Sequence, residues 1–184
     1  MQRFESGVMT GAGSFSCAVC GFAVSLRPTD ALPDCPGCGG RRFVRAPMFG
    51  DTVDVPAPAT ADGPPPAWLE QARSEIADAG NYLVFDSGAG IETVPLPDGW
   101  TRIGRSLSAE IRIDDPTVSR RHALIHRDGD TVRLLDDRSL NGVFRNGRRV
   151  ELDELQDGDS LAVGRFELHF LHLTGTREPA LANA

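Results

Sequence analysis

Lysine is absent from this 184-residue chain, because all 19 of its basic residues are arginine. Together with abundant alanine, glycine, proline and aspartate, this is typical of a protein from a GC-rich genome. The absence excludes chemistry that needs a lysine amine. That covers phosphate binding by a P-loop lysine, Schiff-base catalysis and kinase-type phosphoryl transfer.

Long apolar runs are also missing. No stretch approaches the ~18–20 apolar residues of a membrane span, and the first residues, "MQRFESGVMTGAG", lack the apolar core of a secretory signal. The formal net charge of −7 argues against general attraction to nucleic acid or to an anionic membrane. We therefore expect a cytoplasmic protein with no membrane partner.

The charge is distributed unevenly along the chain. Residues 101–150 contain eleven arginines and seven acidic residues, whereas residues 46–100 contain one arginine and nine acidic residues. The length suits one domain of ~100–150 residues with a smaller appendage. The positive surplus is therefore local, and it predicts an anion site in one part of the chain.

Four cysteines form two C-x-x-C pairs, Cys17 with Cys20 and Cys35 with Cys38, separated by fourteen residues. Because cytosolic thiols stay reduced, this spacing predicts a tetrahedral metal site in a small ribbon over residues 14–45. Zinc in a structural role is favoured. Iron is the weaker alternative, because "CAVCGF" and "CPGCGG" also resemble rubredoxin-like knuckles. So small a unit would take most of its folding free energy from the metal.

A Pro/Ala-rich segment, residues 46–66, predicts a flexible linker. It contains Thr52 and Thr60, which, if phosphorylated, could be bound by the predicted anion site of the same chain. A short amphipathic helix is predicted over 67–79, between Pro66 and Gly80. Residues 174–184 predict a loose tail.

Short alternating or β-branched runs begin at Tyr82, among them "YLVF", "HALIHR", "TVRLLDD" and "RFELHFLHL". Turn residues separate them and no helical period appears among them. The pattern predicts an all-β antiparallel sandwich over residues 82–173. "RNGR" at 145–148 predicts a tight hairpin with Asn-Gly at its centre.

Three loops of this sandwich carry polar residues suited to an anion on a polypeptide. Arginine matches a phosphate with a planar fork of donors, serine adds a hydroxyl donor, and an asparagine amide can pair with both the N–H and the C=O of a peptide. Loops of a sandwich gather at its ends, so we expect these to converge. They are Gly104-Arg105, Ser119-Arg120-Arg121-His122 and Ser139-Leu140-Asn141-Gly142.

These blocks, with "LQDGDSLAVGRFELHFL" after them, resemble the forkhead-associated (FHA) domain, a β-sandwich that binds phosphothreonine peptides. The resemblance implies that Arg105 and Ser119 contact the phosphate and that Arg120 reaches the phosphate or the peptide backbone. Asn141 would bond the peptide main chain. His122, Gly104 and Gly142 would support the loops. Leu140 stands where the family often has Ser or Thr, and Arg120 or Ser139 would compensate.

Ser119 and His122 also suggest a hydrolytic pair, with Asp114 and Asp115 nearby. The chain has no G-x-S-x-G elbow and no identifiable oxyanion hole, so we expect no enzyme activity. The predicted function is a phosphothreonine-binding adaptor in Ser/Thr protein kinase signalling. Arg41, Arg42 and Arg45 after the second knuckle leave nucleic acid as a possible partner of the ribbon, so a nucleic-acid-associated regulator is the alternative.

Overall fold

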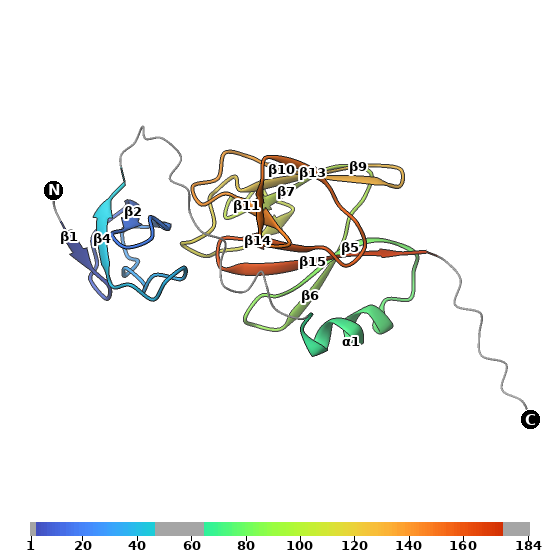
Figure 1. The fold of residues 1–184 in the computed structure, drawn as a ribbon, viewed down its shortest axis with the longest axis horizontal. Helices are drawn as coiled ribbons and strands as arrows, with labels where there is room; N and C mark the ends of the chain where they lie inside the picture. The colour runs from blue at the N-terminus through green and yellow to red at the C-terminus, as the bar shows by residue number, and fades with distance from the viewer. Residues whose placement is uncertain (1–2, 47–64, 175–184) are drawn as a thin grey trace, which may run out of the picture.

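A computed structural model of the chain describes residues 3–46 and 65–174. The N-terminal part is a four-stranded antiparallel sheet, in the order β1-β4-β2-β3, which places β3 at an edge. The ribbon, drawn in blue in Figure 1, lies at one end of a larger β-sandwich. Its strands are β1 (Arg3–Glu5), β2 (Gly13–Cys17), β3 (Ala23–Leu26) and β4 (Arg42–Arg45).

The sandwich consists of two mostly antiparallel sheets, which confirms the predicted fold class. One sheet has the order β13-β10-β9-β7-β8 and the other β12-β11-β14-β15-β5-β6. The first comprises β7 (Gly99–Gly104), β8 (Ile111–Arg112), β9 (Ala123–Asp128), β10 (Thr131–Asp136) and β13 (Leu152–Glu154). The second comprises β5 (Gly80–Asp86), β6 (Ile91–Pro95), β11 (Val143–Arg145), β12 (Arg148–Val150), β14 (Ser160–Val163) and β15 (Phe166–Leu173).

The core of the sandwich follows from strand alternation. Leu83 and Phe85 of β5 point inward with Leu168 and Phe170 of β15, and all four are buried. The intervening Val84 points to the other face of the same sheet. Each strand of this pair therefore contributes apolar side chains to both faces, so the outer face also needs cover.

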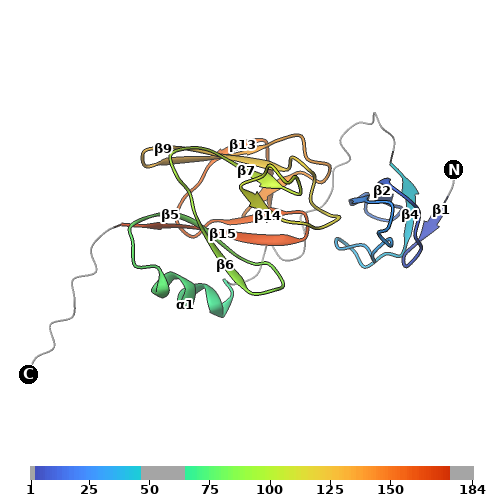
Figure 2. The ribbon, with the colours of Figure 1, turned by 180° about the vertical axis from the view of Figure 1, so that it is seen from behind.

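Helix α1 (Ala67–Glu75) covers that outer face, as Figure 2 shows from behind. Leu69 and Ala72 pack against Val84 and Leu171, and Trp68 lies edge-on to His169 with ring centroids 5.5 Å apart. The helix ends at Glu75, four residues before the predicted end at 79. Ile76 adopts an extended backbone there, with φ −77° and ψ 113°, while its side chain packs against the same cluster.

The predicted hairpin joins β11 and β12, with Asn146 at φ 48° and Gly147 at φ 74°. Two consecutive left-handed residues are what a tight hairpin turn of this kind requires. No helix within the described ranges is long and apolar enough to span a bilayer. Nearly all of the predicted linker, including Thr52 and Thr60, and the tail from residue 175 lie outside the described residues.

Candidate functional site

Three loops meet at the end of the sandwich that faces the ribbon. The first follows β7, the second precedes β9 and the third joins β10 to β11. Main-chain hydrogen bonds fix the first two together: Arg105 N–H donates to Ser119 O at 2.9 Å, and Ser106 N–H donates to Arg120 O at 3.1 Å. The first two loops are therefore joined by backbone contacts, as the predicted convergence requires.

Gly104 permits this close approach. A Cβ at residue 104 would lie 2.4 Å from the carbonyl oxygen of Arg120 and 3.0 Å from that of Ser119. Any side chain at this position would push the two loops apart. The neighbouring Arg105 is partly buried, and desolvation together with the guanidinium of Arg27 lowers the pKa of Arg105 from its ordinary value. An anion beside Arg105 would offset this loss of solvation.

His122 is completely buried and links the second loop to the third. Its Nδ1 accepts the backbone N–H of Ser119 at 3.0 Å, so Nε2 carries the hydrogen and donates to Gly142 O at 3.2 Å. Burial lowers the pKa of His122 to about 4, which keeps the ring neutral. The histidine therefore braces the loops.

The hydroxyl of Ser119 accepts the backbone N–H of Leu140 at 3.1 Å. Its own hydrogen stays available for a ligand, since an accepted bond uses only a lone pair. His122 bonds the Ser119 main chain and not its hydroxyl. The geometry of a serine activated by a histidine base is therefore not formed here.

Asn141 is buried, and its side chain reaches out of the sandwich to the ribbon. Oδ1 accepts the N–H of Ala23 at 2.7 Å, and Nδ2 donates to Ala23 O at 2.7 Å and to Thr117 O at 3.1 Å. The next residue, Gly142, has φ 82°, and a Cβ there would lie 2.6 Å from the Arg149 side chain. The Asn141 amide thus pairs with both main-chain groups, N–H and C=O, of Ala23.

Ser139 is placed differently from Arg105 and Ser119. Its backbone N–H donates to Asp136, but its hydroxyl is buried with no hydrogen-bond partner among the described residues, and it does not line the cavity at the loops. Ser139 therefore does not replace the hydroxyl that Leu140 lacks. Arg120 does line the cavity, so of the two proposed compensating residues it is the better placed.

A cavity of about 390 Å³ lies where the loops face the ribbon. Its walls carry several arginines and hydroxyls, while Asp137 is held by Arg121 through two contacts of 2.7 Å. The lining is therefore cationic and rich in donors. It consists of Ser14, Ser25, Arg105, Ser119, Arg120, Arg121, Asp137, Arg138 and Leu140.

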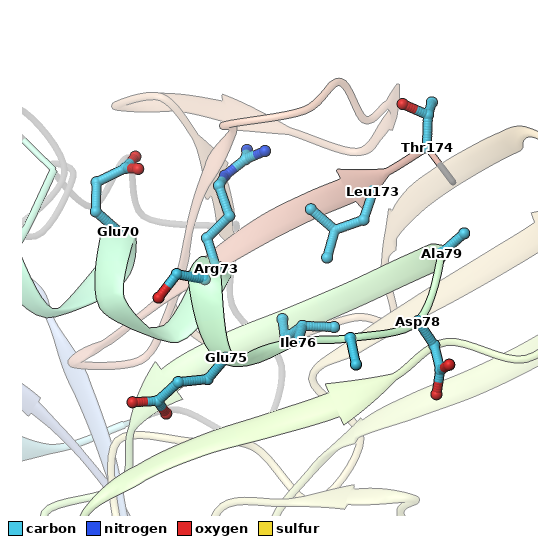
Figure 3. Close-up of a pocket in the computed structure, with 10 residues that line it drawn as sticks. Glu70, Arg73, Glu75, Ile76, Asp78, Ala79, Leu173 and Thr174 are labelled. Carbon is cyan, nitrogen blue, oxygen red and sulfur yellow. The ribbon is translucent and has the colours of Figure 1, made fainter. Parts of the chain in front are cut away.

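Another pocket has a different chemistry. It lies between the C-terminal end of α1 and the end of β15, where Figure 3 shows Glu70, Glu75 and Asp78 around it. Its arginine, Arg73, is paired with Asp157 at 2.6 Å. These residues do not form a phosphate site.

The four cysteine sulfurs of the ribbon gather at one point. Cys17 and Cys38 lie 3.6 Å apart, Cys20 and Cys35 lie 3.5 Å apart, and all four sulfurs fall within 4.8 Å of one another. A tetrahedral zinc with Zn–S bonds of about 2.3 Å places its sulfurs about 3.8 Å apart. Burial raises the pKa of Cys35, so a cation is needed to hold four thiolates together. The cluster fits a metal ion.

Glycines shape both knuckles. Gly21 has φ 78° and Gly39 has φ 68°, and their N–H groups close tight turns onto the carbonyls of Cys17 and Cys35. A Cβ at Gly40 would lie 3.1 Å from the Cys38 sulfur and 3.2 Å from the Cys17 sulfur. The backbone at Gly40 thus packs so close to the sulfurs of Cys17 and Cys38 that a side chain there would crowd them.

The three arginines after the second knuckle differ in their contacts. Arg41 donates to Ser6 and lies 3.4 Å from Asp34, and Arg45 lies over the ring of Phe15. Two of the three are thus engaged within the ribbon.

Sequence reasoning missed several residues at the site. Ser14 and Ser25 line the cavity, Thr117 and Asp115 form a buried pair that shapes the second loop, and Arg27 pairs with Asp114. Ser14, Ser25 and Arg27 belong to the ribbon, and nothing in their local sequence indicates that they lie against the sandwich. Asp114 and Asp115 were considered only as neighbours of a possible hydrolytic pair, Ser119 and His122.

Comparison with known proteins covers both parts of the chain. The model of the FHA domain matches residues 101–164, and that of a zinc-ribbon containing domain matches residues 1–47. The glycogen accumulation regulator GarA of Mycolicibacterium smegmatis is 41% identical over 124 residues, which cover 67% of this chain and 75% of that protein.

Two other similar proteins are longer than the matched region. An oxoglutarate dehydrogenase inhibitor of Corynebacterium jeikeium is 41% identical over 78 residues, covering 42% of this chain and 53% of the inhibitor. An ABC transporter ATP-binding/permease protein of Mycobacterium tuberculosis is 35% identical over 113 residues, covering 61% of this chain. The chain spans 13% of that transporter.

Two solved structures are similar to part of the chain. The FHA domain of FhaA, complexed with the intracellular domain of another protein, is 37% identical, with a TM-score of 0.47, covering 50% of this chain and 99% of that one. EmbR of Mycobacterium tuberculosis, in complex with a low affinity phosphopeptide, is 32% identical, with a TM-score of 0.49, covering 60% of this chain and 30% of that one.

Proposed function

The chain belongs to the family of FHA-domain proteins and carries a zinc-ribbon domain before the FHA domain, and from this we propose that it is a phosphothreonine-binding adaptor in Ser/Thr protein kinase signalling. The observation that carries the proposal is the cavity at the loop end of the sandwich. It brings Arg105, Ser119 and Arg120 together, beside an asparagine that pairs with main chain.

Each of these groups has a part in binding a phosphorylated peptide. The phosphate carries close to two negative charges at neutral pH and has three strong acceptor oxygens. Arg105 and Arg120 supply charge and paired donors, and the free hydrogen of Ser119 supplies a neutral donor. Asn141 binds the main chain of the peptide, which fixes the position of the phosphothreonine.

The chain itself performs no chemistry in this proposal. Ser119 and His122 do not form a nucleophile–base pair, and two similar proteins are named as a regulator and an inhibitor. The phosphate on a partner would decide whether that partner is recruited. Cytoplasmic location is part of the proposal, because the four cysteines need a reducing compartment to remain metal ligands.

The metal proposed for the ribbon is one structural zinc ion held by Cys17, Cys20, Cys35 and Cys38. The sulfur spacing and the small residues around the sulfurs support a closed tetrahedral site. All four positions are filled by protein ligands, which leaves no position for a reacting molecule. Elemental analysis of the purified protein distinguishes zinc from iron.

Calorimetric titration with peptides tests the binding function. We expect binding of a phosphothreonine peptide, weaker binding of the phosphoserine form and none of the unmodified form. Arg105→Ala should weaken binding about 100-fold, because charge-assisted hydrogen bonds contribute ~1.5–3 kcal/mol each.

Arg133→Ala is the matched control, since Arg133 is exposed on β10 and does not line the cavity. It should bind like the wild type. Equal binding of all three peptides, or equal loss in both variants, would contradict the proposal.

A further inference from the structure

Strand β3 of the ribbon presents one row of main-chain groups to the FHA domain. It is the edge strand of the ribbon sheet, so the N–H and C=O groups on its outer side have no partner within the ribbon. In a strand, the main-chain N–H and C=O groups of every second residue point to the same side. In β3, the residues whose groups point outward are Ala23 and Ser25. Both sit at the loop end of the sandwich.

All four of these main-chain groups are bonded to residues of the FHA domain. Asn141 takes both the N–H and the C=O of Ala23 at 2.7 Å. Ser25 N–H donates to Pro116 O at 2.7 Å, and Arg105 Nη1 donates to Ser25 O at 2.7 Å. The docked strand is thus held in an extended form, in the way that a sheet edge holds an added peptide.

The side chains around the strand complete the contact. Ala23 is only 5% exposed, although the ribbon leaves it at an edge. Arg27, directly after β3, pairs with Asp114 of the second loop. Ser14 and Ser25 share a hydrogen bond of 3.1 Å and line the cavity. The ribbon therefore closes over the peptide side of the site and leaves the phosphate side open.

Asn141 cannot serve two main chains at once. Its amide has a single carbonyl oxygen and a single NH₂, and Ala23 engages both, while Nδ2 also bonds Thr117 O. One guanidinium nitrogen of Arg105 is likewise engaged, because it donates to Ser25 O. We propose that β3 is a built-in, unphosphorylated occupant of the peptide site, and that a phosphothreonine peptide binds by displacing the ribbon.

This inference rests on the proposed function, because it assigns to β3 the place of the peptide main chain. It adds a partner for the ribbon, which is the FHA domain of its own chain. It also makes the measured affinity a composite quantity. The apparent association constant for the peptide equals that of the open site multiplied by the fraction of molecules whose ribbon is released.

Ser25→Pro opens the site without changing any residue of the FHA domain. Proline removes the N–H that donates to Pro116 O. That N–H makes no hydrogen bond within the ribbon sheet, and an edge strand such as β3 tolerates proline. Ser25→Ala is the matched control, because it removes the hydroxyl but keeps both main-chain groups. Metal content, measured in both variants, shows whether the ribbon stays folded.

The first measurement is fluorescence anisotropy with a labelled degenerate phosphothreonine peptide and full-length protein. We expect Ser25→Pro to bind about tenfold more tightly than the wild type, because a larger fraction of molecules is open. Ser25→Ala keeps both main-chain groups of the docked strand, so it should not reproduce this gain. Equal affinities of all three proteins would overturn the masking while leaving the proposed function intact.

The second measurement is hydrogen exchange at the Ala23 amide in the absence of peptide. The docked strand protects this amide in the wild type and in Ser25→Ala, and Ser25→Pro should lose that protection. Fast exchange in the wild type would overturn the docking. Protection in the wild type with no peptide binding even by Ser25→Pro would instead overturn the proposed function, and the masking with it.

Discussion

The ribbon and the sandwich are stabilised in different ways. The ribbon core has eight buried residues, two of which are cysteines of the proposed metal site, whereas the main core of the sandwich has seventeen buried apolar residues. A unit as small as the ribbon cannot bury enough surface to fold alone, but a domain of the size of the sandwich can. In the proposal, a bound metal would therefore stabilise the ribbon, whereas apolar packing stabilises the sandwich.

The two parts also bring different groups to their contact. The sandwich contributes side chains, Arg105 and Asn141, held in place by a glycine and a buried histidine. The ribbon contributes mainly main chain, from β3. Changes to the metal should therefore act on the ribbon and the docking, while changes to the loops should act on the sandwich and the site.

Metal removal should have the largest effect. Structural zinc supplies roughly 10–16 kcal/mol in zinc-finger peptides at pH 7, so a chelator should unfold the ribbon and leave the sandwich folded. Two-dimensional NMR would show collapse of the ribbon resonances alone. If the docking is as described, the chelated protein should also bind the phosphothreonine peptide more tightly. Loss of both sets of resonances together would contradict the independence of the two parts.

Acidification should next destabilise the sandwich through His122. Its pKa is about 4 in the folded protein, against ~6.5 when unfolded. Between these two pKa values the unfolded chain binds more protons than the folded protein, so the free energy of unfolding falls as the pH drops. The stability that the neutral, buried His122 provides is fully present above pH 6.5 and is lost as the pH falls toward 4. The loss should reach about 3 kcal/mol in the free energy of unfolding.

Urea titration followed by the fluorescence of Trp68 and Trp100 would measure this loss, since both tryptophans lie outside the ribbon. His122→Gln should be less stable at neutral pH and should show a flatter dependence between pH 6.5 and 4. His126→Gln is the control and should keep the dependence of the wild type. A parallel curve for His122→Gln would contradict the assignment to this histidine.

Gly104→Ala should have a smaller effect, confined to the sandwich. The added Cβ would lie 2.4 Å from Arg120 O, and overpacking of this kind costs about 1–3 kcal/mol. Gly88→Ala is the comparison, because Gly88 has a left-handed φ of 84° but open space around it. Urea unfolding should show the larger loss for Gly104→Ala, together with weaker phosphopeptide binding. An equal loss in both variants would mean that the loops can separate freely.

Arg27→Ala should have the smallest effect. The pair between Arg27 and Asp114 is largely exposed, and such pairs contribute about 0–1 kcal/mol. Removing it should loosen the docking slightly, so the phosphothreonine peptide should bind at most a few times more tightly. Anisotropy at low and high salt would show the difference shrinking as salt rises. A weaker affinity would instead mean that Arg27 binds the peptide.

Much of this arrangement could be predicted from the sequence. The spacing of Cys17, Cys20, Cys35 and Cys38 identified the cluster, because four thiolates at that spacing have few other uses. The spacing of Gly104-Arg105, Ser119 and Asn141 identified the loops. Asn146-Gly147 gave the hairpin, because that pair readily adopts left-handed backbone angles.

The contact between the two parts could not be predicted. It uses the N–H and C=O of Ala23 and Ser25, groups that nearly every residue has, so no residue type marks them. The end of α1 was also missed, because Ile76 continues the apolar pattern while its backbone leaves the helix. The burial of Ser139 could not be predicted either, since the sequence shows a hydroxyl in the loop but not whether it lines the cavity.

The most direct test of one site shared by β3 and a phosphothreonine peptide is hydrogen exchange at the Ala23 amide of the wild-type protein. The amide should exchange slowly in the free protein and rapidly when the site is saturated with the phosphothreonine peptide. The unmodified peptide should leave the rate unchanged. An Ala23 amide that stays protected while the phosphopeptide is bound would contradict the account.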